Sequence, residues 1–514
     1  MIVALALGLA VLPVFFVVKQ YARKRASNPS TLPYPPGPKP LPIVGNHFDI
    51  PKKTPWKTYA AWGRDYGELI HLNVLGQHYI ILNSKRVTVD LLEKRNRIYS
   101  DRPIVPMIQM MGWDWNIGLM PYGLAWRQRR REFHQQFTAA KSKEYHPTVT
   151  SKAHELLRNL LGNPEAFLKH IQHYTAAISM AIAYNYEVAS SNDEYVAMVE
   201  ASVDMLGHAT FPGAVIANAF PILRHLPAWL PGMRFKRFAE ACRKLTTEMK
   251  RAPYHFVKAR IDLGVPTKCV TSELIGRFAE DGKLTPESED VIKDVGAITY
   301  AAGADTSSSA ASASILAMVL YPEATNKAQA EIDRVIGKTR LPSLEDRPSL
   351  PYVEAFFREL IRWHSITPLS VPRAALEDDI YDGYFIPKGT IVLQNTWAIH
   401  HDERIYDEPE VFKPERFLNS DGSISDEYPI MAFGHGRRIC PGRHLADAMI
   451  WTEIALVLAG FDITKAKDEK GHDIDPPVQF TDTIISHPEP FMYKIHPRSK
   501  EFEVLINETS QHLL

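Results

Sequence analysis

The segment Phe433-Gly-His-Gly-Arg-Arg-Ile-Cys440-Pro-Gly442 is the most informative stretch of this 514-residue sequence. Its loop glycines allow tight turns and close backbone approach, because glycine readily adopts positive φ. Pro441 can open a following helix, which would place Cys440 at a helix N-terminus. At that position the helix dipole and the free backbone N–H groups favour thiolate over thiol. Cys440 is therefore a candidate nucleophile or axial metal ligand.

The composition excludes several classes of protein. The only other cysteines, Cys242 and Cys269, are interpreted as buried structural thiols. Three widely spaced cysteines exclude a disulfide scaffold and a four-cysteine zinc site, and they fit a reducing compartment. Lys+Arg and Asp+Glu both number 59, so the sequence lacks the basic bias of nucleic-acid-binding proteins. A hydrophobic content of 45% excludes disorder of the whole chain.

The N-terminal sequence predicts a membrane anchor. Residues Ile2–Val18 carry no polar or charged side chain, which is at the short end of what spans a bilayer as a helix. Positive charges, among them Lys19 and Arg23, follow this run, whereas in a cleaved signal peptide they precede it. The positive-inside rule then places the rest of the chain in the cytosol. A cleaved signal peptide is the alternative interpretation.

The proline-rich stretch Thr31–Pro42 predicts a stiff spacer, with a ligand of SH3 domains as the alternative. Beyond it we find no repeat, second linker or long charge block, which favours one large domain. The expected parts are a membrane anchor with a basic stop (1–25), a Pro-rich hinge (26–45), a catalytic domain (46–497) and a C-terminal tail (498–514).

The hydrophobic periodicity predicts a mainly α domain with a small β part. The β patterns are at Leu69–Val74, Tyr79–Leu82 and Tyr384–Leu393. The amphipathic helices are expected at Gln128–Phe137, Lys152–Leu161, Arg234–Arg251 and Tyr352–Trp363.

One predicted helix is unusually long. Thr285-Pro286-Glu287 is a helix start signal, and the helical pattern runs to Tyr321, where Pro322 stops it. Its middle, Ala301–Ser309, consists of small and polar residues that are poor for helix stability. Because small residues make space, we expect a bulky group to lie against this point.

The loop around Cys440 resembles the haem-binding signature of the cytochrome P-450 family, the haem-thiolate monooxygenases. The pattern Phe-x-x-Gly-x-Arg-x-Cys-x-Gly is met at Phe433, Gly436, Arg438, Cys440 and Gly442. The resemblance extends from the anchor to about residue 497. It implies a triangular helical haem domain with a long central helix, and Cys440 as the axial thiolate ligand of haem b.

Three further motifs follow in the order of the family. Ala302–Thr306 resembles the oxygen-activation motif, Glu359–Arg362 the Glu-x-x-Arg motif, and Pro414–Phe417 the segment that completes its ion network. The sequence around the cysteine, including Arg443-His-Leu-Ala-Asp447, is most similar to that of fungal members that modify secondary metabolites, such as O-methylsterigmatocystin oxidoreductase.

The resemblance implies roles for the residues of these motifs. Thr306 and Asp305 would deliver protons to iron-bound dioxygen; a satisfied Asp-Thr pair in the core is the alternative. Glu359, Arg362 and Arg416 would form a buried triad, with a surface ion pair as the alternative. Residues matching family positions around the haem and its propionates are Arg102, Trp126, Arg130, Arg373, Phe433 and Arg438, and for Arg102 and Arg373 a plain surface role is the alternative.

Two surfaces suggest partners. The family docks its NADPH-cytochrome P-450 reductase, with cytochrome b5 as a further candidate donor, beside a basic patch; an ordinary solvated face is the alternative. Phe211–Gly232 predicts contact with the membrane surface, or else an internal connection. The expected location is the endoplasmic reticulum membrane, single-pass, with the catalytic domain in the cytosol. The basic patch comprises Arg127, Arg129, Arg131, Lys141 and Lys143.

These features together predict a membrane-bound monooxygenase that uses O2 and reductase-supplied electrons. The stretches expected to line its pocket, such as Met107–Met120, are mostly apolar. They favour a medium-sized lipophilic substrate, such as a terpenoid or an aromatic intermediate, for hydroxylation or epoxidation. The alternatives are a haem-thiolate isomerase or dehydratase that acts on peroxides without a reductase, and a non-catalytic haem-binding protein.

Overall fold

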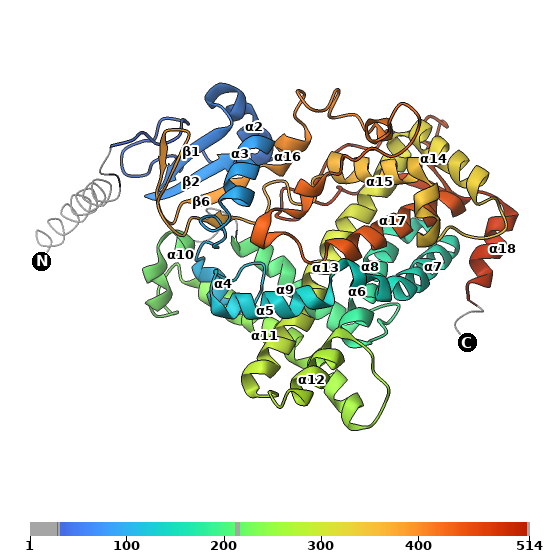
Figure 1. The fold of residues 1–514 in the computed structure, drawn as a ribbon, viewed down its shortest axis with the longest axis horizontal. Coiled ribbons are helices and arrows are strands. Elements are labelled where there is room, and N and C mark those ends of the chain that lie inside the picture. Colours follow the sequence, from blue (N-terminus) through green and yellow to red (C-terminus); the bar gives the residue numbers. More distant parts are fainter. Residues whose placement is uncertain (1–27, 29–30, 211–215, 511–514) are drawn as a thin grey trace, which may run out of the picture. The chain divides into compact units, whose positions relative to one another are not determined.

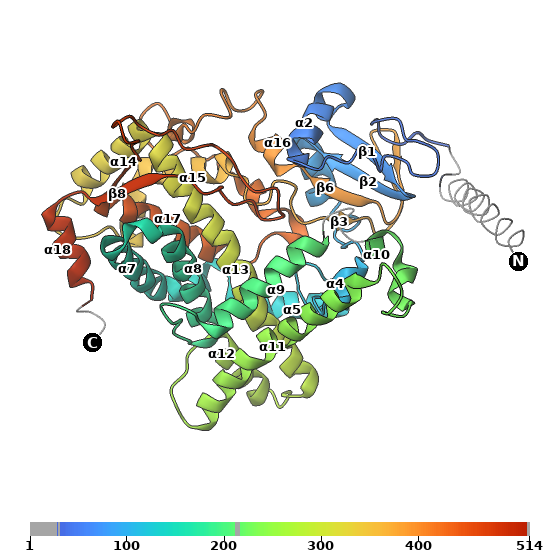
Figure 2. The same ribbon diagram turned by 180° about the vertical axis from the view of Figure 1, so that it is seen from behind.

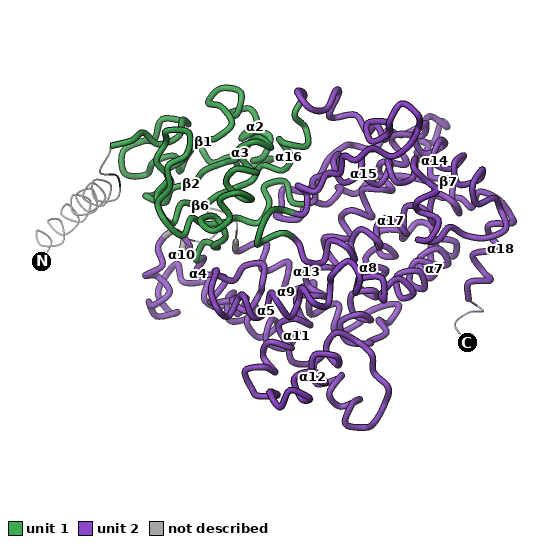
Figure 3. Tube along the Cα trace, viewed as in Figure 1, with its two compact units in different colours: residues 1–104, 367–402, 434–439 green, residues 105–366, 403–433, 440–514 purple. Residues whose placement is uncertain are grey.

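The computed structural model describes residue 28 and residues 31–210 and 216–510. The predicted membrane anchor, 1–25, lies outside the described residues, as do 211–215 of the stretch expected at the membrane surface. Within the described ranges, no helix has both the length and the apolar character that crossing a bilayer requires. The chain divides into two compact units, each assembled from separate segments (Figure 3): unit 1 comprises 1–104, 367–402 and 434–439, and unit 2 comprises 105–366, 403–433 and 440–514.

Unit 1 is built on a four-stranded sheet with the strand order β1-β2-β6-β3. β2 pairs antiparallel with β1 and parallel with β6, and β3 pairs antiparallel with β6. Strands distant in sequence thus become neighbours, as the orange β6 beside the blue β2 shows (Figure 1). The elements of unit 1 are α2 (Pro55–Tyr66), β1 (Leu69–Val74), β2 (Gln77–Leu82), α3 (Lys85–Thr88), β3 (Arg373–Ala374), β4 (Asp379–Tyr381), β5 (Tyr384–Ile386), β6 (Ile391–Gln394) and α16 (Thr396–His400).

The predicted strand at Leu69–Val74 is confirmed, and the next strand begins at Gln77 rather than Tyr79. The β pattern at Tyr384–Leu393 is wrong as a single strand, because the structure divides it between β5 and β6, which belong to different sheets. Pro387 has no N–H to donate to a ladder, and Gly389 has a φ of 79°, so the chain turns between the two strands.

Unit 2 is almost entirely helical. Its helices α7 and α8 lie side by side in both views (Figures 1 and 2), and α8 is also the main helix partner of α13. The helices are α4 (Pro106–Met110), α5 (Leu124–Gln136), α6 (Ala139–Ser142), α7 (His146–Gly162), α8 (Phe167–Tyr184), α9 (Glu194–Thr210), α10 (Ile216–Ala219), α11 (Arg234–Asp262), α12 (Val270–Glu280), α13 (Pro286–Leu320), α14 (Pro322–Val335), α15 (Pro351–Trp363), α17 (Arg443–Gly460) and α18 (Lys500–Glu508), with strands β7 (Phe461–Lys465) and β8 (Tyr493–Pro497).

The long helix predicted from the sequence is α13, and both its start and its end are confirmed. The side chain of Thr285 accepts a hydrogen bond from the backbone N–H of Ser288, whose hydroxyl accepts one from the N–H of Thr285, and Pro286 occupies the first turn. The helix has 35 residues and is therefore roughly 52 Å long. Most of it is buried on every side, as expected of a helix that crosses a core.

Several helix boundaries differ from expectation. Helix α5 begins at Leu124 rather than Gln128, and α7 begins at His146 rather than Lys152. Helix α17 begins at Arg443 with Gly442 as the N-cap residue, so Pro441 precedes the helix instead of opening it. Helix α11 does not end at Arg251 but continues through Pro253 to Asp262. Burial of Tyr254 and Val257 beyond the proline gives the reason, because tertiary packing outweighs the cost of one helix-interior proline.

A buried carboxyl group lies where α13 meets α17. Glu453 is completely buried, and the hydroxyl of Ser314 contacts both of its oxygens, at 3.0 and 3.1 Å. Burial raises the pKa of Glu453 well above its ordinary value, and the Ser314 hydrogen bond opposes this only weakly. The folded protein therefore holds a proton on Glu453 that the unfolded chain releases near pH 4.5.

Glu453→Gln should flatten the pH dependence of stability. Stability due to the protonated Glu453 is fully present below the pKa of the unfolded chain and is lost as pH rises through the folded pKa, by about 1.4 kcal/mol per pH unit within that window. The amide cannot ionise, so the melting temperature of the variant should gain on wild type between pH 5 and pH 9. Thermal melts followed by circular dichroism measure this, and parallel curves would contradict the assigned protonation state.

Candidate active site

The segment around Cys440 is held by the backbone of unit 2. The N–H of Cys440 donates to the carbonyl oxygen of Phe433 at 2.8 Å. Between these residues, Gly434 and Gly436 have φ values of 76° and 53°. A Cβ on Gly436 would lie 2.7 Å from the carbonyl oxygen of Leu92, so the close backbone approach expected for the loop glycines is confirmed within unit 1.

Cys440 is suited to be a metal ligand rather than a free thiolate. The backbone N–H groups of Gly442 and Arg443 and the charges of Arg130 and Arg443 lower the pKa of its thiol, in the direction expected at a helix start. Burial outweighs them and raises the pKa overall. A cation bonded to the sulfur removes this penalty, because a coordinating thiol is deprotonated outright. The residue keeps some accessible surface, so a bound group can reach it.

The middle of α13 is open although its flanks are buried. Residues 302–306 keep accessible surface, whereas 294–301 and 307–319 are buried. The hydroxyl of Thr306 donates to the carbonyl oxygen of Ala302 at 2.6 Å, which keeps the side chain along the helix wall. Ala302 is the most exposed of these small residues. Gly303 has a different role, because a Cβ there would approach the Ser179 hydroxyl of α8 to 3.2 Å.

Asp305 is paired with a residue that the sequence did not suggest. Its Oδ1 lies 3.0 Å from Nε2 of His487, and both side chains are about one-third exposed, at 36% and 30%. Glu200 of α9 is close enough for the charge of Asp305 to raise its pKa, in addition to the effect of burial. A mid-helix aspartate signals the need for a partner, but no local spacing in the sequence identifies His487 or Glu200 as that partner.

Unit 1 brings together three of the predicted propionate-binding residues. Arg102, Arg373 and Arg438 are all buried, with exposed fractions of 6%, 4% and 8%, so the alternative of a surface role is wrong for Arg102 and Arg373. Burial, and then the charges of Arg438 and Arg373, lower the pKa of Arg102 far below its ordinary value. Burial also lowers the pKa of Arg373 to about 10.

The hydrogen bonds of these arginines position them for an anion. Arg102 donates to the carbonyl oxygens of Val371 and Pro372 at 2.6 Å. Nη2 of Arg373 donates to the carbonyl oxygen of His435 at 2.7 Å, and Nε of Arg438 donates to that of Ser100 at 2.8 Å. Backbone carbonyls hold guanidinium groups in place without neutralising them. A cluster of three buried cations therefore fits a group with two carboxylates, as haem has.

The other two residues predicted to face a propionate come from α5 in unit 2. Trp126 is buried, and its indole N–H donates to the carbonyl oxygen of Ile117 at 3.1 Å. Arg130 is half-buried, and its charge and the Cys440 sulfur act on each other's pKa. The structure thus places Arg130 near the sulfur. Trp126 is held by its hydrogen bond to Ile117, which lies in the chain before α5.

The predicted ion triad is formed and buried. Arg362 makes a bidentate pair with Glu359, with both N–O distances at 2.7 Å and both residues fully buried. Nε of Arg416 lies 3.4 Å from Oε1 of Glu359, which also accepts the N–H of Lys413 at 2.8 Å. The alternative of a surface pair is therefore wrong.

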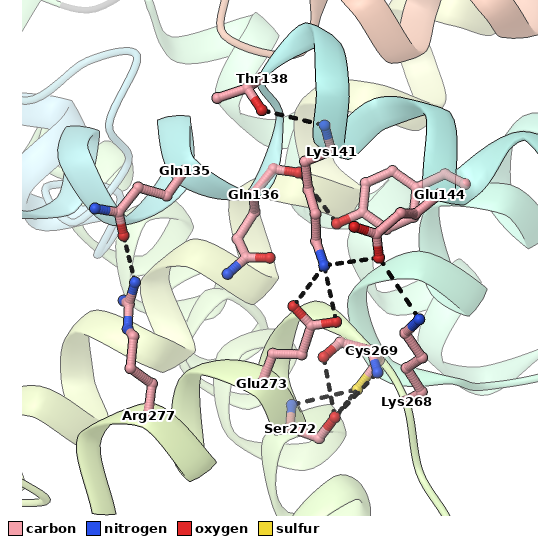
Figure 4. A network of polar contacts seen from close by, with 11 residues as sticks. Gln135, Gln136, Thr138, Lys141, Glu144, Lys268, Cys269, Ser272, Glu273 and Arg277 are labelled. Carbon is pink, nitrogen blue, oxygen red and sulfur yellow. Dashed lines mark hydrogen bonds and ion pairs between the residues drawn. The ribbon is translucent and has the colours of Figure 1, made fainter. Parts of the chain in front are cut away.

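The predicted basic patch is smaller than expected. Arg129 is largely buried and pairs with Asp294 at 2.6 Å. Lys141 lies between Glu144 and Glu273, at 3.0 and 2.9 Å, as Figure 4 shows. These two cations therefore bind carboxylates of their own chain. The exposed members of the patch are Arg127, Arg131 and Lys143.

Comparisons with known proteins agree with this geometry. The family model described as Cytochrome P450 matches residues 35–495. Cytochrome P450 monooxygenase 208 of Postia placenta is 40% identical over 508 residues, which are 98% of this chain and 97% of that protein. Cytochrome P450 monooxygenase COX2 of Coprinopsis cinerea is 40% identical, with coverage of 93% and 92%. Tryptamine 4-monooxygenase of Psilocybe cyanescens is 38% identical, with coverage of 94% and 96%.

Glu359→Gln should destabilise the protein strongly. It removes the carboxylate that pairs bidentately with the buried Arg362, and breaking a buried ion pair costs roughly 3–5 kcal/mol. The matched control is Glu377→Gln, which breaks an exposed pair with Arg97 of 2.9 Å and should cost less than about 1 kcal/mol. Guanidinium unfolding gives both free energies. Equal small losses in the two variants would show that the buried pair does not stabilise the fold.

Proposed function

The chain belongs to the cytochrome P450 family, and from this we propose that it hydroxylates or epoxidises a medium-sized lipophilic secondary metabolite with electrons from an NADPH-dependent reductase. It is a cytochrome P450 monooxygenase, which uses haem b with an axial cysteine thiolate, O2, a redox partner and a small-molecule substrate. The observation that carries the finer proposal is the open stretch 302–306 of α13, with Asp305 and Thr306 on an otherwise buried helix.

We propose that Cys440 is the axial ligand and that the arginines of unit 1 bind the propionates. The bound haem supplies the redox chemistry with dioxygen, which no side chain can perform. The charges of the buried Arg102, Arg373 and Arg438 repel one another. A charge-assisted hydrogen bond from each of them to a propionate would offset part of this repulsion. The carbonyl oxygen of Phe433 accepts the N–H of Cys440 and so fixes the backbone that carries the sulfur. Arg130 and Trp126 complete the proposed cofactor-binding set.

We propose that Thr306 and Asp305 handle the protons that oxygen activation consumes. The Thr306 hydroxyl can keep its hydrogen bond to Ala302 while its oxygen accepts a proton from another donor. Asp305 is partly exposed, so it can exchange protons with solvent. A haem-thiolate isomerase or dehydratase that acts on peroxides has no need of such groups, which disfavours that alternative.

We also propose a substrate class, a surface for reductase docking and a cellular location. The printed name of one relative states that it acts on tryptamine, an aromatic amine, and this supports an aromatic intermediate beside the terpenoid class. Arg127, Arg131 and Lys143 are the exposed cations that we propose for reductase docking. An anchor at 1–25 would hold the catalytic domain, 46–497, on the cytosolic face of the endoplasmic reticulum membrane.

Thr306→Ala should divert electrons from product to hydrogen peroxide. Without the hydroxyl, proton delivery is misdirected, and product per NADPH should fall roughly tenfold or more. Peroxide and product are measured against NADPH consumption, and the carbon-monoxide difference spectrum checks that haem is bound. Thr306→Ser keeps the hydroxyl and is the matched control. Unchanged coupling in the alanine variant would contradict the assigned role.

An optical titration of the ferric protein tests the substrate class. We expect terpenoids or aromatic intermediates, including tryptamine and other indoles, to shift the Soret band saturably, because a ligand in an apolar pocket changes the surroundings of the haem. A hydrophilic sugar phosphate is the negative control. If no member of the lipophilic panel shifts the band, the proposed substrate class is wrong, whereas the family membership is unaffected.

A further inference from the structure

The ion pair between Asp305 and His487 gives the acidic residue of α13 a partner that can itself release a proton. Their Oδ1 and Nε2 atoms lie 3.0 Å apart, which is a charge-assisted hydrogen bond when the imidazole is protonated. A lysine or arginine at this place would stay charged at neutral pH. Histidine ordinarily changes charge between pH 5 and pH 8. The histidine of this pair can therefore transfer a proton to Asp305 as well as form an ion pair with it.

The loop that carries His487 is held firmly by hydrogen bonds. The N–H of His487 donates to the hydroxyl of Thr481 at 3.0 Å, and the N–H of Thr481 donates to the carbonyl oxygen of His487 at 2.8 Å. The adjacent Ser486 donates its N–H to Ile366 at 2.8 Å, and its carbonyl oxygen accepts the hydroxyl of Ser309 in α13. The imidazole is thus placed against α13 by its own loop as well as by Asp305.

The buried titratable groups around the pair are poorly suited to bring in protons. His364, at the end of α15, is buried, and burial together with the charge of His487 lowers its pKa to about 3, so it stays neutral. Tyr300 is buried, and its pKa is raised. Glu200 of α9 is exposed as well, and burial and then the charge of Asp305 raise its pKa, so it is a second group that solvent protons can reach, without the direct contact that His487 makes with Asp305. His487 combines direct contact with Asp305 and an exposed fraction of 30%.

We propose that His487 is a positioning residue of the proton relay, through which protons from solvent reach Asp305. The inference rests on the proposed function, in which Asp305 and Thr306 deliver protons. In each transfer the Nε2–H bond of the imidazolium breaks and an O–H bond forms at Oδ1 of Asp305. The neutral imidazole then regains its proton from solvent water, so no other reactant is needed.

A purely structural role makes different predictions. If the pair only latched the loop onto α13, a permanent cation would replace the imidazole without loss. His487→Arg keeps a charge partner for Asp305 but cannot give up a proton at neutral pH. His487→Gln keeps a hydrogen-bond donor without charge. His173→Gln is the matched control, because His173 makes the same kind of pair with Glu155, also at 3.0 Å, on α8 and α7.

The experiment measures product and hydrogen peroxide per NADPH from pH 5.5 to pH 9 in the haem-loaded wild type and in the variants His487→Gln, His487→Arg, Asp305→Asn and His173→Gln. We expect wild type and His173→Gln to lose coupling as pH rises from 5.5 to 9, because a histidine side chain ordinarily loses its charge within this range. His487→Gln and His487→Arg should be roughly tenfold less coupled near pH 7 and should lack that inflection. Carbon-monoxide difference spectra establish that each variant binds haem.

A second readout does not depend on turnover. Melting temperatures of wild type, His487→Gln, Asp305→Asn and the double variant form a cycle that measures the coupling of the two side chains. We expect coupling at pH 6 that is lost at pH 9, because the imidazolium contributes it. Coupling that is the same at both pH values, or absent at both, would overturn the proposal.

The outcomes separate the inference from the proposed function. If Asp305→Asn uncouples the enzyme but His487→Gln or His487→Arg behaves as wild type, Asp305 draws its protons elsewhere, and the role of His487 is wrong. If Asp305→Asn also remains fully coupled, the relay of the proposed function itself is wrong. Loss of the pH inflection in both His487 variants, with wild-type behaviour in His173→Gln, supports the entry of protons through His487.

Discussion

Burial of α13 is the constraint on which unit 2 depends. A polar side chain on a buried helix has to find a partner, because an unpaired one costs the full penalty of desolvation. Thr299 bonds within α13, to the carbonyl oxygen of Val295, but other polar positions of this helix have partners in other elements and so favour the segments that surround it. Residues 302–306, in the middle of the helix, keep accessible surface, and of these Asp305 also has an ion-pair partner. The paired positions are Asp294 with Arg129 of α5 and Lys250 of α11, Asp305 with His487, Ser309 with His364, and Ser314 with Glu453 of α17.

The sequence was most informative where local chemistry decides the structure. The cap and stop of α13, the strand β1 and the Glu359–Arg362 pair follow from residue types at fixed spacing, and all three are present, whereas Arg416 was indicated by the family motif. The sequence did not indicate which distant residues pair with each other. Nothing near Asp305 identifies His487, and no pattern within α5 reveals that Arg129 is bound to a distant aspartate. The same limit explains why the predicted docking patch was too large. Five cations on α5 and just after it suggested the patch, and three of them are exposed.

Charge placement follows opposite rules in different parts of the molecule. In unit 2, buried carboxylates such as Glu359 have guanidinium partners within hydrogen-bond distance. In unit 1, Arg102, Arg373 and Arg438 are buried together, and burial, followed by the charges of Arg438 and Arg373, depresses the pKa of Arg102, which the charge of Asp101 opposes. Such a cluster opposes folding unless an anion compensates it.

The assembly of unit 1 from three chain segments has a consequence for biosynthesis. Each segment contributes one of the clustered arginines: Arg102 comes from the first, Arg373 from the second and Arg438 from the third. During translation the N-terminal parts of a chain can begin to fold before the rest emerges. The arginine cluster, however, cannot be complete until residue 438 has left the ribosome. Completion of this cluster is therefore a late event in the life of the nascent chain, and translation products that end before residue 438 lack one of its three arginines.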